Sequence, residues 1–180
     1  MDIRWILLMG ALLLSENSAA ADSPTAFADW YVGTADDKSY VFAATTNDSG
    51  DSFGEYCYFK TGKCNWLIGM HTNCKTGQTG VVLANSDSNS AALDIYCYGP
   101  VGDIAAYGFQ NWKSLEGTLK DASRVGFAVP LEADKFKVVR FSLTGRMDAT
   151  TQVETYFSEQ VKNQKPASVT PKQGTRTETL

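Results

Sequence analysis

The sequence predicts a mostly β fold, a β-sandwich or barrel-like set of antiparallel sheets, with a short helix near residues 113–123 and a C-terminal helix near residues 148–162. Two observations favour it. Within residues 54–99, short hydrophobic runs alternate with clusters of Gly, Asn, Asp and Ser, as in strands joined by turns. The same stretch holds all four cysteines, which is typical of a β-structure stabilised by disulfides.

Residues 1–21 have the pattern of a secretory signal peptide. Arg4 precedes an apolar run over residues 5–14, and three alanines ending at Ala21 offer a cleavage site. The run is much shorter than the roughly 20 apolar residues that a membrane span needs. We therefore expect a periplasmic or secreted protein that begins near Asp22 and has no stable membrane insertion.

The remaining sequence predicts one domain followed by a tail. Residues 22–162 suffice for a single core. Residues 163–180 lack aromatics and are rich in Lys, Thr, Gln and Pro, which predicts a disordered polar tail. The formal net charge of −4 gives no basic footprint for nucleic acid. No Gly-rich phosphate loop introduces a helix, and we expect no cofactor.

Cys57, Cys64, Cys74 and Cys97 are most simply two disulfides in an exported chain. Three pairings are open. Cys57 with Cys64 and Cys74 with Cys97 is the favoured one, because each bridge then links neighbours in sequence across a predicted turn. Zinc and redox sites are the competing interpretations, but both commonly use a Cys-x-x-Cys pair, which the sequence lacks.

The first predicted strands follow one another closely. Trp30 lies in a first β-rich segment and is expected to cap the core, and residues 40–44 form the next segment. Residues 57–69 predict a tight hairpin, whose register a bridge between its two cysteines would fix. The polar residues 85–90 predict the tip of a second hairpin.

Two segments near the C-terminus have helical period. Their expected buried positions are Trp112, Leu115, Leu119 and Ala122 in the helix near 113–123, and Ala149, Val153, Tyr156, Phe157 and Val161 in the helix near 148–162. The polar face of the second helix carries both signs of charge. This indicates packing on the domain rather than on a membrane.

Residues 124–131 and 135–145 form the strongest predicted strand pair, in which Pro130 marks a strand end or an edge. Several of its residues, GFAVPL at 126–131 and FSLTG at 141–145, occur after Trp30 and the four cysteines and before Ala149. In that order the chain resembles the invasion-associated locus B family of bacterial exported proteins, over about residues 28–157.

The resemblance implies a compact, mostly β domain located in the cell envelope. The family has no established reaction, and some members are linked to host-cell invasion. The resemblance therefore carries over no catalytic residue, and transfer of the invasion role would rest on analogy of fold alone.

Candidate ligand residues lie in polar loops. Residues 47–51 and 85–90 offer oxygen ligands, so cation binding is open, although the spacing is not that of an EF-hand and the same residue types suit turns. His71 is the only histidine. No nucleophile motif such as Gly-x-Ser-x-Gly accompanies it, and we expect it to be a polar loop residue.

Two functions of different classes follow. The first is a non-enzymatic interaction or binding protein of the bacterial envelope, whose partner is an unidentified envelope or host protein. Trp66, Tyr98 and Trp112 are its expected exposed aromatics. A periplasmic inhibitor or immunity protein that acts against an envelope-acting enzyme is an alternative within this class.

The second is a carboxylate-dependent hydrolase, with Asp48, Asp51, Glu55 and Asp87 as candidates. General acid and base catalysis needs two carboxylates that converge in a cleft and differ in pKa. The candidates lie in predicted loops, where solvation is the default. We therefore expect the protein not to be an enzyme, and we expect no catalytic residue and no metal site.

Overall fold

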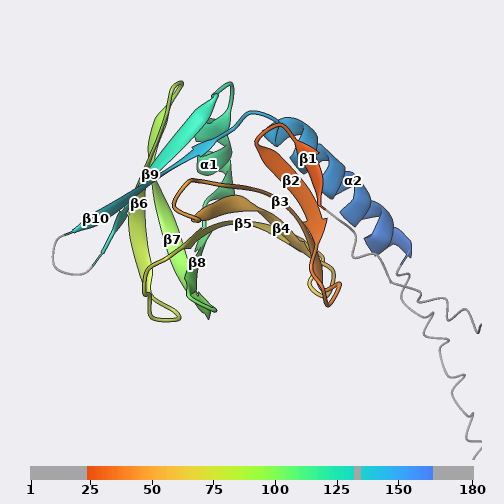
Figure 1. Cartoon of the computed structure of the whole chain (residues 1–180). Coiled ribbons are helices and arrows are strands. Elements are labelled where there is room, and N and C mark those ends of the chain that lie inside the picture. The colour runs from red at the N-terminus through yellow and green to blue at the C-terminus, as the bar shows by residue number, and fades with distance from the viewer. Residues whose placement is uncertain (1–23, 132–134, 164–180) are drawn as a thin grey trace, which may run out of the picture.

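Figure 1 shows a computed structural model of the chain, in which residues 24–131 and 135–163 are described. Ten strands form one antiparallel sheet. The elements are β1 (Thr25–Phe27), β2 (Trp30–Thr34), β3 (Tyr40–Thr46), β4 (Ser52–Tyr58), β5 (Lys63–Met70), β6 (Thr79–Ser86), β7 (Ser90–Val101), β8 (Ile104–Phe109), α1 (Trp112–Leu119), β9 (Arg124–Pro130), β10 (Phe136–Ser142) and α2 (Arg146–Asn163). The mostly β prediction is confirmed. The predicted signal peptide and the tail beyond residue 163 lie outside the described residues.

The strand order in the sheet is β1-β2-β3-β4-β5-β8-β7-β6-β9-β10. Strands adjacent in the chain pair with each other, and the order departs from the chain at two places, where β5 pairs with β8 and β6 with β9. Figure 1 shows the sheet bending over, with β6, β9 and β10 on one side of the interior and β2, β3, β4 and α2 on the other. A single sheet thus supplies both walls of a sandwich-like fold.

The core gathers around Phe53, which is fully buried on β4. Its ring centroid lies 6.0 Å from that of Trp30, 5.1 Å from that of Phe127 and 5.5 Å from that of Phe141. Trp30 is buried as well, and its indole N–H donates to the backbone carbonyl of Ser142 over 2.9 Å. Trp30 therefore ties the first strands to the end of β10, in agreement with its expected place in the core.

One disulfide joins two neighbouring strands, and a second joins a loop to a strand. Cys57 and Cys64 stand opposite each other in the β4–β5 register with Cα atoms 3.9 Å apart, and they close the predicted hairpin. Cys74, in the loop after β5, is bonded to Cys97 on β7, with Cα atoms 6.2 Å apart. Both disulfides therefore match the pairing that was favoured from the sequence.

The strand pair predicted near the C-terminus is the β9–β10 hairpin. Its register runs without interruption from the pair Pro130–Phe136 to the pair Arg124–Ser142. Pro130 is the last residue of β9, which fits its predicted place at a strand end. β10, rather than β9, lies at the edge of the sheet.

α1 buries Leu115, Thr118 and Leu119 against the sheet. Trp112, which the helical period placed on the buried face and which was also expected among the exposed aromatics, is 54% exposed. The buried residues of the helix begin one turn later, at Leu115. Trp112 is the first residue of the helix and precedes this buried stripe. The helix also ends at Leu119, several residues before the predicted end.

α2 packs its buried residues Ala149, Val153 and Phe157 on the first half of the sheet, as predicted. Tyr156 and Val161, also expected to be buried, are 42% and 38% exposed. These buried residues are four positions apart and form a narrow line on the helix. Tyr156 lies beside this line, and Val161 continues it one turn beyond Phe157, the last buried residue of the helix. Among residues 24–131 and 135–163, no helix is both long enough and apolar enough to span a bilayer.

Candidate functional site

The outer face of the sheet, away from the core, carries a row of aromatic side chains. Successive residues of a strand point to opposite faces. On β4, Phe53 and Cys57 are buried in the core, and Tyr56 and Tyr58 face outward. The aromatic residues that face outward on β2, β3, β4 and β7 are Tyr31, Tyr40, Phe42, Tyr56, Tyr58, Tyr96 and Tyr98. We call this set the tyrosine face.

The rings of the tyrosine face contact one another across strands. Phe42 stacks on Tyr56 with centroids 5.6 Å apart. The centroids of Tyr40 and Tyr58 are 5.3 Å apart. Ring pairs at these separations stabilise a sheet beyond the area that they bury. The tyrosine face is therefore an ordered surface.

Glycines on the neighbouring strands leave room for the rings. The ring of Tyr98 lies over Gly108 of β8, where any Cβ atom would overlap it. The ring of Phe42 lies over Gly33 of β2 in the same way. An aromatic ring that covers a glycine shields the exposed backbone and fixes the orientation of the ring.

A groove of about 480 Å³ crosses the tyrosine face. Its lining residues are Tyr40, Ser52, Tyr56, Tyr58, Asn65, Leu67, Gly69, Tyr98, Val101, Ile104 and Ala106. None of these side chains carries a formal charge. Tyr98 is 52% and Val101 is 72% exposed, so one side of the groove is open to solvent. We call it the outer groove.

Two phenols of the outer groove, those of Tyr56 and Tyr58, have raised pKa values and stay neutral. Burial raises the pKa of Tyr56, and the neighbouring Tyr31 adds to the effect. Burial also raises the pKa of Tyr58, with smaller contributions from Tyr40 and Tyr98. A neutral phenol can donate one hydrogen bond and accept others. The groove thus offers apolar ring faces and neutral polar groups, which suit an uncharged ligand segment.

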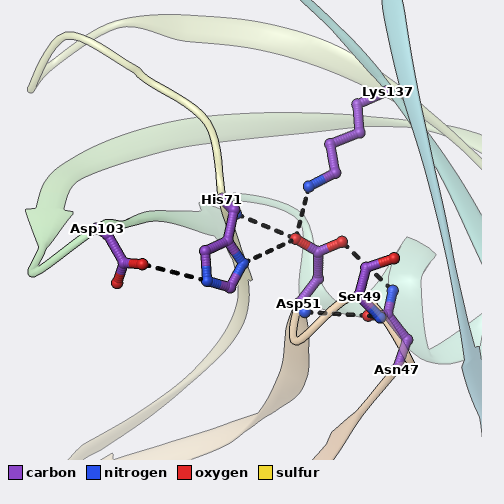
Figure 2. Close-up of polar contacts among 6 residues, drawn as sticks. All are labelled: Asn47, Ser49, Asp51, His71, Asp103 and Lys137. Carbon is purple, nitrogen blue, oxygen red and sulfur yellow. Dashed lines mark hydrogen bonds and ion pairs between the residues drawn. The ribbon is translucent and has the colours of Figure 1, made fainter.

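A polar cluster stands apart from the outer groove and is shown in Figure 2. Asp51, in the loop before β4, has a side chain that is only 1% exposed. The ammonium Nζ of Lys137, on β10, lies 2.6 Å from Asp51 Oδ1. The backbone N–H of His71 donates to the same oxygen over 3.0 Å, and the amide of Asn47 donates to Oδ2 over 3.4 Å. The cluster joins the β3–β4 loop to β10, across the interior.

Electrostatics keeps the Asp51 carboxylate charged. Burial by itself would raise the pKa of Asp51, but hydrogen bonds from Lys137, the His71 backbone and Asn47 outweigh it, and the pKa is lowered. A carboxylate paired so closely with an ammonium is a weak base. The arrangement therefore suits a structural ion pair better than general base catalysis.

His71 lies at the exposed side of this cluster. Its Nδ1 is 3.7 Å from Asp51 Oδ1, and its Nε2 is 3.4 Å from Oδ2 of Asp103 in the β7–β8 turn. The side chain is 41% exposed. Figure 2 shows the imidazole between the two carboxylates. This position agrees with the expectation of a polar residue outside the core.

Comparisons with known proteins place the fold. No family model matches the chain, and no curated protein matches it. Among solved structures, the crystal structure of invasion associated protein B from Bartonella henselae is similar, with a TM-score of 0.53 and 14% sequence identity over 76% of this chain and 99% of that chain. The two proteins share a fold. At this identity the likeness concerns the backbone alone.

The structure brings one of the three expected interaction aromatics to the groove. Tyr98 lines it. Trp66 is not an exposed aromatic: it faces inward from β5, and its ring centroid lies 6.1 Å from that of Trp30 and 5.1 Å from that of Phe53. Residues two positions apart on a strand lie on the same face, and Trp66 is two positions before the buried Ile68. Trp112 is exposed on α1, away from the residues that line the groove.

The outer groove has a weak signal in the sequence. Aromatic residues recur two positions apart in three strands, at 40 and 42, 56 and 58, and 96 and 98. This spacing places each pair on one face of its strand. The pattern alone does not say which face is buried, because the intervening residues are also apolar or small. The groove residues other than Tyr98 were therefore missed.

The four carboxylates considered for hydrolysis lie in different environments. Asp48 is exposed in the β3–β4 loop, and Asp51 is paired with Lys137. Asp87, in the β6–β7 turn, accepts hydrogen bonds from the backbone N–H and the hydroxyl of Ser123. The two loops considered for cations thus use several of their oxygens to bind the chain itself.

Glu55, the fourth carboxylate, was expected in a solvated loop, but it lies on the inner face of strand β4 and is only 7% exposed. Its Oε2 atom has no hydrogen-bond partner among the described residues. Burial, together with Glu154 and Glu116, raises its pKa to about 7, and Arg146 partly opposes this. The sulfur atoms nearby belong to the disulfide of β4 and β5, so they offer no thiolate to a metal ion.

Proposed function

We propose that the protein is a non-enzymatic, exported interaction protein of a bacterial envelope, and that the outer groove is its binding surface. The observation that carries this is the groove itself, an open and uncharged hollow of about 480 Å³ built from four tyrosines on a rigid sheet. Tyrosine supplies a large contact area at a small loss of conformational entropy, and it is enriched at binding interfaces.

Export is supported by two features. The two disulfides suit an oxidising compartment, and residues 1–21 have the predicted pattern of a signal peptide. Membership of the invasion-associated locus B family is part of the proposal, supported by the shared fold and by the motifs at 126–131 and 141–145. The partner that we propose is a neutral segment of an envelope or host protein.

The absence of catalysis is supported by the environments of the acidic residues. Asp51 is held by an ammonium, and Asp87 by Ser123. Glu55 lies on the opposite face of β4 from the outer groove. None of the three belongs to that groove, which offers phenols, an amide and a hydroxyl. These are binding groups rather than an acid–base pair with separated pKa values.

Site-specific photo-crosslinking tests the proposal. A photo-reactive phenylalanine analogue replaces Val101, which is 72% exposed in the outer groove. The same analogue at Trp112 is the control, because Trp112 is similarly open but lies on α1. In producing cells, and in contact with host cells, we expect a discrete crosslinked product from position 101 and none from position 112.

The protein captured at position 101 is then purified and titrated. Val101→Glu places a charge in the uncharged groove and should weaken binding roughly tenfold or more, because a desolvated charge has no partner there. Trp112→Glu should leave the affinity unchanged. Equal crosslinking at both positions, or equal affinity of both variants, would overturn the assignment of the groove.

A further inference from the structure

The two edges of the sheet differ in how they are covered. β1 is short, and its end is covered by the chain that leads into α2, where the backbone of Gly145 packs on the Phe27 carbonyl and the Asp29 N–H donates to Thr144 over 3.3 Å. β10 is longer, and among the described residues it pairs with β9 alone. An uncovered edge strand is a template for another strand.

The register identifies the free backbone groups of β10. Leu143 donates to Ser123, and Leu131 donates to Lys135. In an antiparallel pair only every second residue forms backbone hydrogen bonds with the neighbouring strand. In β10 the odd-numbered residues therefore bond to β9. The even-numbered residues point their N–H and C=O groups away from β9. At Ser142 this carbonyl is already taken by the Trp30 indole. The free groups are those of Phe136, Val138 and Arg140.

β10 lacks two of the usual protections of an edge. It contains no proline, and its register with β9 has no bulge. Its one inward charge, Lys137, is neutralised by Asp51. On the outer face, Phe136 is 62% and Val138 is 51% exposed. Natural edges commonly carry a charge, a proline or a bulge that prevents further pairing, and of these β10 has only charges, at Lys137 and Arg140.

We propose that β10 is the interface between two copies of this chain, which pair antiparallel about a two-fold axis at Val138. This register uses all three free residues at once: Val138 faces Val138 of the second copy, and Phe136 faces Arg140 of the second copy in both directions. The proposal concerns a surface distinct from the outer groove, so it stands or falls independently of the proposed function.

The free edge is self-complementary in this register. An arginine opposite an aromatic ring makes a cation–π contact, and two valines make an apolar pair. A register centred on Arg140 would instead place two like charges opposite each other, which is unfavourable. The apolar surface continues from Val138 to Leu83, which is 56% exposed on β6 and lies in the same surface hollow.

Sedimentation velocity over a range of concentrations tests the dimer, with a matched pair of substitutions at its centre. Val138→Pro removes an N–H that β9 does not use, so the sheet keeps its own bonds. It deletes both central bonds of the dimer and should weaken dimerisation roughly 30-fold. Val138→Thr keeps the N–H and should dimerise like the wild type. Circular dichroism verifies that both variants are folded.

Two substitutions at Phe136 test the register. Phe136→Glu places a carboxylate opposite Arg140 of the second copy and should preserve or strengthen the dimer. Phe136→Lys places an ammonium there and should weaken it at least tenfold. Association through general stickiness of the exposed ring would be reduced by both changes alike.

Three results would overturn the proposal: a wild type that stays monomeric up to its solubility limit, a Val138→Pro variant that dimerises as well as Val138→Thr, or equal behaviour of the two Phe136 variants. A monomer that instead binds an added strand-forming peptide at β10 would assign the edge to a different partner.

Discussion

Asp51, in the loop before β4, and Glu55, on the inner face of β4, are acidic residues four positions apart, and both are almost completely buried. Three donors surround Asp51, namely the ammonium of Lys137, the backbone N–H of His71 and the amide of Asn47. The Oε2 atom of Glu55 has no such partner among the described residues. The pKa of Asp51 is accordingly lowered, and that of Glu55 is raised to about 7.

The comparison shows that burial alone does not set the charge of a carboxylate. Desolvation acts on both groups in the same direction, and the hydrogen-bond donors decide the outcome. The ion pair of Asp51 with Lys137 therefore connects the β3–β4 loop to β10. Glu55 is a buried group whose effect on stability depends on pH.

Removing Asp51 should have the largest effect. Asp51→Ala leaves the ammonium of Lys137, whose side chain is 24% exposed, without its counter-ion. Removing one partner of a buried ion pair costs about 3 to 5 kcal/mol of folding free energy. Because Lys137 is partly exposed, we expect a loss of about 3 kcal/mol. Urea unfolding at pH 7 measures it.

Asp103→Ala is the matched control for this change, because Asp103 also faces His71 but is 83% exposed. It should alter the free energy of unfolding by less than about 0.5 kcal/mol. If the two variants lose the same amount of stability, the ion pair between Asp51 and Lys137 contributes nothing beyond a surface contact.

Glu55→Gln should instead increase the free energy of unfolding. The folded protein holds a proton on Glu55 up to about pH 7, whereas an ordinary glutamate loses it near 4.5. Between these values the folded state binds more protons than the unfolded chain, so stability falls as the pH rises. The full effect is about 3 kcal/mol, complete below pH 4.5 and lost above pH 7. Glu55→Gln should therefore stabilise the protein by about 3 kcal/mol at pH 8 and hardly at all at pH 4.5.

Urea midpoints measured from pH 4 to pH 8 test this, with Glu154→Gln as the control. Glu154 is exposed on α2 and raises the pKa of Glu55 only through its charge. Its replacement should leave most of the pH dependence in place. A wild-type protein whose stability does not fall over this range would contradict the assignment to Glu55.

Much of the fold could be predicted because its signals are local. The hairpin of residues 57–69 depends on a turn and on two cysteines that face each other across it. The β9–β10 pair depends on alternation within two short runs. Such patterns depend on residues close together in the sequence, and both strand pairs are present in the structure. The exceptions, Trp112, Tyr156 and Val161, are helix residues whose apolar stripe was assumed to be wider or longer than the contact that the helix makes.

The sites could not be predicted in the same way because they depend on distant segments. Asp51 and Lys137 are 86 positions apart, and only the curvature of the sheet brings them together. The outer groove takes residues from β3, β4, β5, β7 and β8. Trp66 shows the related difficulty within one strand, because its chain neighbours Asn65 and Leu67 both face the groove and only the tertiary fold decides which face is buried.

The smallest effect is expected at His71, although it is the only histidine in the sequence. Its contribution to Asp51 comes from the backbone N–H at 3.0 Å, which any residue except proline retains, whereas its ring stands 3.7 Å away. His71→Ala should therefore change the free energy of unfolding by no more than about 0.5 kcal/mol at pH 7. Asn47→Ala should cost more, about 1 kcal/mol, because its side-chain carbonyl accepts from the backbone N–H groups of Ser49 and Asp51. If His71→Ala proved the more damaging of the two in urea unfolding, the imidazole rather than the backbone would be the group that holds the Asp51 carboxylate in place.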